Sequence, residues 1–277
     1  MKIFFIGVFG TKGSTNISQK EAFEELGHQV VTYEYRLMGA YAIPYMASLE
    51  HPDLVLFSKC NGVPYDIINA CNKFSKTCLW YMDPSHGFDK ELIDKIERVS
   101  FSCFALNKPY EMAKELANNV FFVHEGFDSK RIYPVPSTKK HDISFIGTLY
   151  GHRQEYFNAK NFHIYSNVFD EAHNKAVAET KINLNFTNNE GSSDRIYKIL
   201  AAKGFVLTEP WRGIEPTFAV GRDLDVFSNT DQLNYKIELY LRNEGLRNSM
   251  AEQGYLTVQQ FTRLNWARKI IELSEIV

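Results

Sequence analysis

Short apolar runs alternate with amphipathic stretches along nearly the whole chain. Runs that are apolar on both faces are typical of strands in a parallel sheet that is covered on both sides. Amphipathic stretches such as Gln19–Leu26 and Tyr110–Leu116 lie between these runs and predict helices. The alternation of the two patterns indicates an α/β fold. In the first half the predicted strands are Lys2–Val8, Val30–Tyr35, Leu54–Ser58, Cys78–Met82, Phe101–Leu106 and Val120–Val123.

A second series of the same kind follows a break in the pattern. The segment Tyr133–His141 holds two prolines and several polar residues, which indicates a linker between domains. After it, strands are predicted at Ile143–Ile146, His163–Tyr165, Ile182–Phe186, Phe205–Thr208 and Leu224–Phe227, and helices at Asp194–Lys203, Leu233–Arg242, Leu246–Val258 and Leu264–Ile276. The predicted parts are an N-terminal domain (1–134), a linker (135–141), a C-terminal domain (142–260) and a closing helix (261–277) that could pack back on the N-terminal domain.

The order of elements predicts an α/β protein with two Rossmann-like, doubly wound domains. Such domains bind ligands outside the carboxyl ends of their parallel strands. Two of them joined by a short linker place a cleft between them, with the carboxyl ends of both sheets facing it. We expect a ligand to bind in that cleft.

Composition narrows the class of protein. The chain has 277 residues, of which 44% are hydrophobic, so a small disulfide scaffold and a disordered chain are excluded. A net charge of −2 argues against a protein that mainly grips polyanions. The four cysteines form no Cys-x-x-Cys pair, and we expect reduced core thiols in a cytoplasmic protein. No signal peptide is evident, and no run reaches the ~18 apolar residues of a transmembrane segment.

The most informative stretch is residues 182–209, where a strand leads into a polar loop and then a helix. The helix opens at Ser192, Ser193 and Asp194 and is closed by Gly204. Free N–H groups and the helix dipole make the opening turn a candidate site for an anion such as a diphosphate. The alternative is that these serine and aspartate side chains merely cap a surface helix.

Two cations follow in the same helix. Arg195 and Lys198 stand three residues apart on one helical face, so both could reach the same phosphates. The alternative for Lys198 is a solvated helix residue without a role in binding.

The stretch resembles the donor-binding signature of the GT-B glycosyltransferases. In that signature two glutamates separated by seven residues precede an Ala-rich helix end, a glycine and a strand. Glu190 stands at the first glutamate position and Lys198 at the second. The sequence is most similar to the CgeB-like (spore-maturation protein) glycosyltransferases, in the segments Ser193–Thr208 and Gly213–Gly221, with further likeness in Asp142–Thr148 and Arg247–Arg268.

The resemblance implies a GT-B architecture in which the C-terminal domain binds a nucleotide-diphosphate sugar as co-substrate, with no other cofactor. In the family the second glutamate commonly holds the ribose hydroxyls, and a lysine accepts no hydrogen bond. Lys198 could instead pair with phosphate, or Glu209 could hold the ribose. Gly147 and Thr148 correspond to the glycine loop of the donor domain, and Arg153 could add positive charge there.

The N-terminal domain offers two further candidates. Gly10, Thr11 and Lys12 follow the first strand, where the resemblance places the acceptor side; the alternative is a flexible turn. Asp83 and His86 follow the fourth strand, where either could accept a proton from an acceptor hydroxyl. The alternatives here are a turn opener for the aspartate and a structural role for the histidine.

These features predict a metal-independent glycosyltransferase of the hexosyltransferase type, because no clustered His, Asp and Glu residues have metal-ligand spacing. Glu190 is a third candidate for the catalytic base. The acceptor stays open between a glycan, a protein, a small molecule and a modified nucleic-acid base. Two other functions are a nucleotide-sugar epimerase of the same architecture and a noncatalytic nucleotide- or sugar-binding module.

Overall fold

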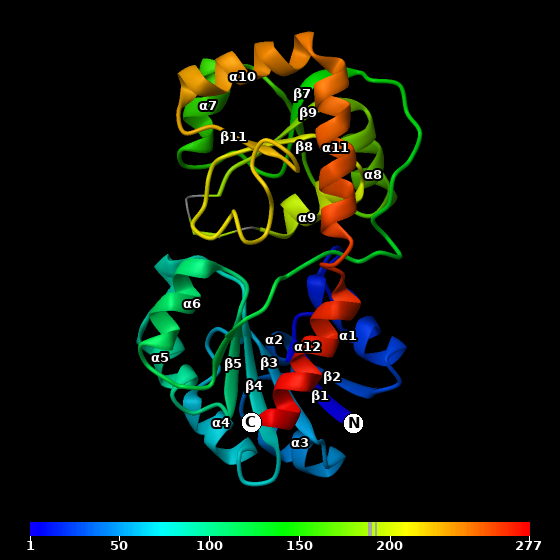
Figure 1. The fold of residues 1–277 in the computed structure, drawn as a ribbon. Helices are drawn as coiled ribbons and strands as arrows, with labels where there is room; N and C mark the ends of the chain where they lie inside the picture. The colour runs from blue at the N-terminus through cyan, green and yellow to red at the C-terminus, as the bar shows by residue number, and fades with distance from the viewer. Residues whose placement is uncertain (188–189, 192) are drawn as a thin grey trace. The chain divides into compact units, whose positions relative to one another are not determined.

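A computed structural model describes residues 1–187, 190–191 and 193–277. The chain divides into two compact units, which are described separately. Unit 1 consists of Met1–Glu125 and Arg263–Val277, and unit 2 of Gly126–Thr262. The first unit therefore ends earlier than the predicted boundary at residue 134, because residues 126–134 make their contacts within unit 2. The last helix belongs to unit 1 (Figure 1).

Unit 1 is built on a six-stranded sheet with the order β2-β1-β3-β4-β5-β6. Every pair in it is parallel, with Phe5 of β1 opposite Leu56 of β3. The strand order reverses between β1 and β3, which is the point where open α/β sheets bind ligands. The strands are β1 (Lys2–Gly7), β2 (Gln29–Glu34), β3 (Leu54–Ser58), β4 (Lys76–Tyr81), β5 (Phe101–Phe104) and β6 (Val120–Phe122).

Helices cover both faces of this sheet. On one face lie α1 (Thr15–Glu25) and α12 (Arg263–Ile276). The other helices of the unit are α2 (Tyr35–Met38), α3 (Ile43–Glu50), α4 (Tyr65–Cys71), η1 (Ser85–Gly87), α5 (Lys90–Ile96) and α6 (Asn107–Lys114). Trp266 of α12 packs its ring 5.1 Å from that of Phe23 and 5.4 Å from that of Trp80. This aromatic contact joins the end of the chain to the core of the first unit.

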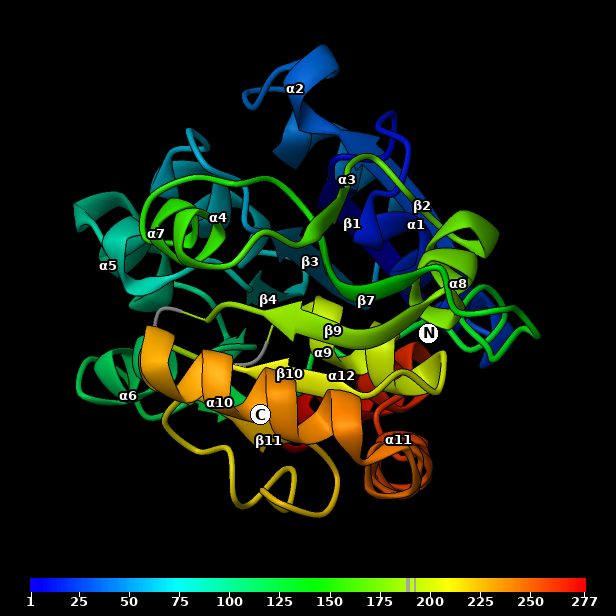
Figure 2. The same cartoon turned by 90° about the horizontal axis from the view of Figure 1, so that it is seen from above.

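Unit 2 has a five-stranded parallel sheet with the order β11-β10-β9-β7-β8. The strands are β7 (His141–Ile146), β8 (His163–Tyr165), β9 (Thr180–Asn185), β10 (Val206–Thr208) and β11 (Asp225–Val226). The helices are α7 (Arg153–Ala159), α8 (Glu171–Ala178), α9 (Asp194–Ala201), α10 (Thr230–Arg242) and α11 (Glu244–Val258). Residues of α8 and α9 pack on one face, and residues of α7 and α10 on the other (Figure 2).

Close packing fixes α9 against its sheet at Gly204, the predicted end of this helix. A Cβ at this position would lie 2.4 Å from Val177 Cγ1 and 2.8 Å from Ile199 Cγ2. Glycine is therefore required at position 204, two residues before β10 begins.

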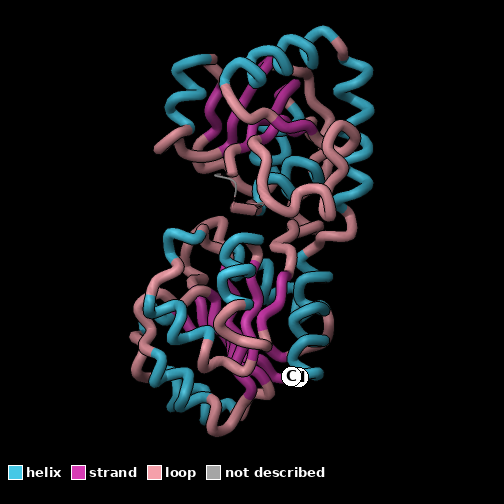
Figure 3. The backbone as a smooth tube through the Cα atoms, turned by 60° about the vertical axis from the view of Figure 1, so that its left-hand side comes forward, coloured by secondary structure: helices cyan, strands magenta, loops and turns pink. Residues whose placement is uncertain are grey.

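The predicted α/β class is confirmed: each unit has a parallel sheet flanked by helices (Figure 3). Each predicted strand is present, with ends that differ by a residue or two. The four cysteines are free and buried, in agreement with the predicted core thiols. Among the described residues, no helix is long and apolar enough to cross a membrane.

Candidate active site

The carboxyl edge of the unit 2 sheet includes a turn at Gly147, directly after β7. Its φ is 147°, and a Cβ there would lie 3.0 Å from Arg195 Nη2 and 3.0 Å from the Phe145 ring. A side chain at this position would push the guanidinium aside. Glycine therefore lets Arg195 approach the backbone of the turn.

Arg195 comes from the first turn of α9 and is anchored to the ends of two strands. Its Nε donates to the carbonyl of Ile146 at 2.6 Å, and its Nη1 donates to Asn185 Oδ1 at 3.0 Å. Its Cζ lies 4.8 Å from the centroid of the Phe145 ring. Burial lowers the pKa of Arg195 to about 10; the negative charge of Asp194 opposes this shift, and the charge of Arg153 adds to it. The remaining nitrogen, Nη2, faces Gly147.

Arg153, the first residue of α7, places a second buried cation at the same ring. It is 8% exposed, and its Nη1 donates to the carbonyl of Thr148 at 3.1 Å. Its Cζ lies 5.5 Å from the Phe145 ring centroid and 4.2 Å from that of Tyr150. In the part of the chain that the structure describes, neither Arg153 nor Arg195 forms an ion pair with a carboxylate. Because buried positive charge is costly when it has no direct ionic partner, the two guanidiniums are candidates to bind an anion.

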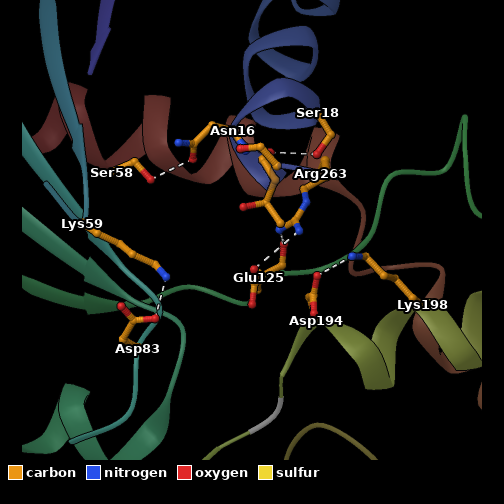
Figure 4. Close-up of polar contacts among 11 residues, drawn as sticks. Asn16, Ser18, Ser58, Lys59, Asp83, Glu125, Asp194, Lys198 and Arg263 are labelled. Atoms are coloured by element: carbon orange, nitrogen blue, oxygen red, sulfur yellow. Dashed lines mark hydrogen bonds and ion pairs between the residues drawn. The ribbon is translucent and has the colours of Figure 1, made fainter. Parts of the chain in front are cut away.

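The start of α9 lies beside these arginines. Ser193 is the N-cap residue, yet its side chain makes no capping bond, and its buried Oγ has no partner among the described residues. Ser192 lies outside the described residues. Lys198 Nζ forms an ion pair with Asp194, one turn earlier (Figure 4). Arg195 and Lys198, expected to reach the same phosphates, thus have different partners.

His173 on α8 is a residue that the sequence analysis missed. It is 4% exposed, and burial, followed by the charge of Lys198, lowers its pKa to about 3. The imidazole is therefore neutral at pH 7. The only signal in the sequence is its spacing, three and four residues before Ala176 and Val177, which is typical of the buried face of a helix.

Glu209 follows β10 and joins two loops of the carboxyl edge. Its Oε2 accepts the backbone N–H of Thr187 at 2.8 Å and lies 3.0 Å from His152 Nε2. Burial, with a further contribution from Glu209, raises the pKa of Tyr156 to about 12. Glu190, half-buried, lies in the loop that begins at Thr187. His152 and Tyr156 were not predicted; their contact with Glu209 depends on the pairing of distant strands.

In unit 1, Gly10, Thr11 and Lys12 are exposed in the loop after β1. Glu34, at the end of β2, accepts the backbone N–H groups of Phe9 and Gly10, the latter at 3.1 Å. The loop is therefore attached to the neighbouring strand at its first residues. This role of Glu34 has no local signal in the sequence, because only the parallel pairing of β1 and β2 brings it to the loop.

Asp83 and His86 lie in the segment after β4. Asp83 Oδ1 forms an ion pair of 2.5 Å with Nζ of Lys59, which follows β3 (Figure 4). His86 is exposed in η1. The candidate base Asp83 is thus held by an ammonium group that sequence reasoning missed, because only the parallel pairing of β3 and β4 brings the two residues together.

The described residues contain no group of three or more His, Cys, Asp and Glu side chains that could hold a metal ion. The sequence does contain an Asp-x-Asp triplet, Asp223 to Asp225, a spacing that metal sites also use. Both carboxylates already have cationic partners: Asp223 Oδ1 lies 2.8 Å from Arg222 Nε, and Asp225 Oδ1 lies 2.7 Å from Lys236 Nζ.

The fold is that of a two-domain α/β protein, and Arg153 and Arg195 form a candidate anion site at the carboxyl edge of its second sheet. Residues 132–272, half of the chain, match the glycosyl transferase-like family. The chain therefore belongs to this family. Its likeness to the CgeB-like subfamily stays a prediction. No curated protein matches the chain significantly.

Solved structures show the same fold over the whole chain. HepE from Anabaena, in complex with UDP and glucose, has a TM-score of 0.72 at 10% identity and is covered completely, as is this chain. Sucrose-phosphate synthase from Thermosynechococcus elongatus has a TM-score of 0.70 at 11% identity, with 100% of this chain and 98% of that chain covered. A glycosyltransferase from Rickettsia africae has a TM-score of 0.68 at 12% identity, with 99% and 98% covered. The fold is thus that of GT-B glycosyltransferases.

Proposed function

We propose that the protein transfers a sugar, of the hexosyl type, from a nucleotide-diphosphate sugar to an acceptor hydroxyl. The observation that carries this proposal is that the buried Arg153 and the half-buried Arg195 lie at one aromatic ring, and that neither forms an ion pair with a carboxylate of the described residues. Buried charges are normally paired, and a diphosphate would supply the missing negative charge. Family membership supports the reaction class.

The donor would bind at the carboxyl edge of the unit 2 sheet. Its diphosphate would contact Arg153, Arg195 and the backbone at Gly147, next to the first turn of α9. Backbone N–H groups at a helix start favour an anion. Because Lys198 is paired with Asp194, we assign the ribose to the neighbourhood of Glu209, which is held in place by Thr187 and His152.

We propose the following reaction. The acceptor oxygen forms a bond to the anomeric carbon, and the bond from that carbon to the diphosphate oxygen breaks. A base takes the proton of the acceptor hydroxyl; Asp83, His86 and Glu190 are the candidates. The diphosphate leaves with negative charge that Arg153 and Arg195 stabilise, as fixed cations do at developing anions. We therefore propose that no metal ion is needed.

UDP is the first nucleotide to test. The fold is similar to that of HepE in complex with UDP-glucose, with a TM-score of 0.70 and 11% sequence identity between the two chains. The free, buried cysteines support a reducing, cytoplasmic setting.

The test combines binding with turnover. UDP, GDP, ADP and dTDP and their hexose conjugates are added separately, and the melting temperature is measured. A ligand at 100 times its Kd adds ~2.7 kcal/mol of stability, which corresponds to about 2 to 4 °C for a chain of this size. Nucleotide release is then measured with and without acceptors. Absence of any shift contradicts the donor site.

The same assay separates the alternatives. An epimerase converts the donor to another sugar nucleotide without releasing the nucleotide and without an acceptor. A binding module shifts the melting temperature and leaves the donor unchanged. A transferase releases nucleotide faster when its acceptor is present.

A further inference from the structure

Two consecutive residues after β3 have a left-handed backbone: φ is 58° at Lys59 and 57° at Cys60. Residues other than glycine rarely adopt this conformation, and such strain is concentrated at functional sites. The turn follows β3 at the reversal of strand order beside β1, where open α/β sheets bind ligands. The strain therefore occurs where unit 1 is expected to bind a ligand.

A buried charge holds this turn in place. Lys95 of α5, 2% exposed, donates from Nζ to the carbonyl of Cys60 at 2.6 Å and forms an ion pair with Glu91. Glu91 Oε1 also accepts the backbone N–H of Gly62 at 2.7 Å. A buried ammonium needs partners. Lys95 and Glu91 together hold the backbone of Cys60 and Gly62, which directly follow Lys59.

A second network ties the same strand end to the loop after β1. Ser58 donates from Oγ to Asn16 Oδ1 at 2.8 Å (Figure 4). Asn16 Nδ2 donates in turn to the carbonyl of Val8 at 3.3 Å. A Cβ at Gly7 would lie 2.3 Å from Asn16 Nδ2, so the bridge requires glycine there. The start of the loop after β1, at Val8, is thus connected through Asn16 to the end of β3, which leads into the Lys59 turn.

The result of both networks is an accessible ion pair at the strand ends. The side chains of Lys59 and Asp83 are 37% and 33% exposed. The ammonium can only donate hydrogen bonds, and the ionised carboxylate can only accept them. Neighbouring hydroxyls of a sugar match this pair, because each hydroxyl both donates and accepts. The pair has no net charge and the chain carries −2, so a polyanionic acceptor is not favoured.

We propose that Lys59 and Asp83 together bind the acceptor, and that the acceptor is a neutral carbohydrate. One sugar hydroxyl donates to Asp83, and a neighbouring oxygen accepts from Lys59. This inference rests on the proposed function, because it assigns the substrate of the same reaction.

The test measures acceptor binding without the donor. Methyl glycosides of glucose, galactose and mannose are titrated against the protein by saturation-transfer NMR, and a serine-containing peptide serves as the non-carbohydrate probe. We expect at least one glycoside to bind and the peptide not to bind. Lys59→Met should weaken glycoside binding about tenfold or more, as for loss of a charge-assisted hydrogen bond. Lys59→Arg keeps a positively charged hydrogen-bonding group and should restore most of the glycoside binding.

Lys20→Met is the matched control. Lys20 forms an ion pair of 2.8 Å with Glu24 at similar exposure, 33% and 41%, but within α1. This variant should bind glycosides like the wild type. Failure of all glycosides to bind the wild type, binding of the peptide in their place, or equal binding by Lys59→Met overturns the inference. A UDP-induced shift in melting temperature tests the donor site separately, and Lys59→Met should leave that shift unchanged.

Discussion

Arg153 and Arg195 differ in how much of the fold depends on them. Arg195 bonds to the ends of both β7 and β9, so replacing it would disturb the sheet as well as a ligand. Arg153 donates to the backbone carbonyl of Thr148, and its buried Nε has no partner among the described residues. Arg153 is therefore the better residue for separating binding from stability.

We predict that Arg153→Met weakens binding of a nucleotide diphosphate by ~1.5 to 3 kcal/mol, the range for a hydrogen bond to a charged group. Methionine keeps an apolar chain of similar length against Phe145 and removes the uncompensated charge. The ligand-free protein should therefore be no less stable than the wild type. Calorimetric titration and urea unfolding measure the two quantities.

Arg242→Met is the control for loss of a positive charge, because the Arg242 side chain on α10 is 81% exposed. It should change neither affinity nor stability appreciably. If Arg153→Met binds the nucleotide as well as this control does, Arg153 has no role in the donor site.

At the scale of elements, α8 and α9 contribute buried residues to one hydrophobic cluster on the same face of the unit 2 sheet. His173 of α8 is neutral in the folded protein because burial lowers its pKa to about 3. In the unfolded chain its pKa is near the ordinary value of about 6.5. As the pH falls below 6.5, the unfolded state therefore binds a proton that the folded state does not.

We predict that His173 makes the protein less stable in acid. For each unit by which the pH falls between about 6.5 and 3, protonation of His173 in the unfolded chain lowers the free energy of unfolding by up to about 1.4 kcal/mol. At pH 5 the loss is about 2 kcal/mol relative to pH 7. His173→Phe removes the titrating group, so its free energy of unfolding should fall less between these pH values. Urea unfolding at pH 7 and pH 5 measures the difference.

Val177→Ala, one turn further along α8, is the matched control. Val177 is fully buried, so truncation lowers stability at both pH values by about the same amount. A wild-type pH dependence in His173→Phe would contradict the assignment.

At the scale of the whole molecule, the proposed function assigns stabilisation of the leaving diphosphate to Arg153 of α7 and Arg195 of α9. The described residues hold no cluster of metal ligands, and the carboxylates of Asp223 and Asp225 are occupied by Arg222 and Lys236. We predict that transferase activity survives an excess of EDTA, because fixed cations replace a metal at the diphosphate. Loss of nucleotide release in EDTA, restored by magnesium or manganese, would disprove this prediction.

The class of fold follows from the sequence itself. A run such as Leu54–Ser58 is apolar on both faces, and only a covered parallel sheet buries it. Cap and turn residues mark the element ends, as at Gly204. These signals are local, because each depends on residues that are neighbours in the sequence and can be recognised without knowing which segments pack together. The family pattern around Glu190 likewise occupies one continuous stretch.

Only the tertiary structure decided which side chains meet. Lys59 and Asp83 are brought together by the parallel pairing of β3 and β4, and Glu209 reaches His152 because β10 and β7 both flank β9. The unit boundary at Glu125 has the same origin, since α12 returns to unit 1 through the contacts of Trp266. Strand order and burial depend on the packing of distant segments, and no local pattern of polar and apolar residues records that packing.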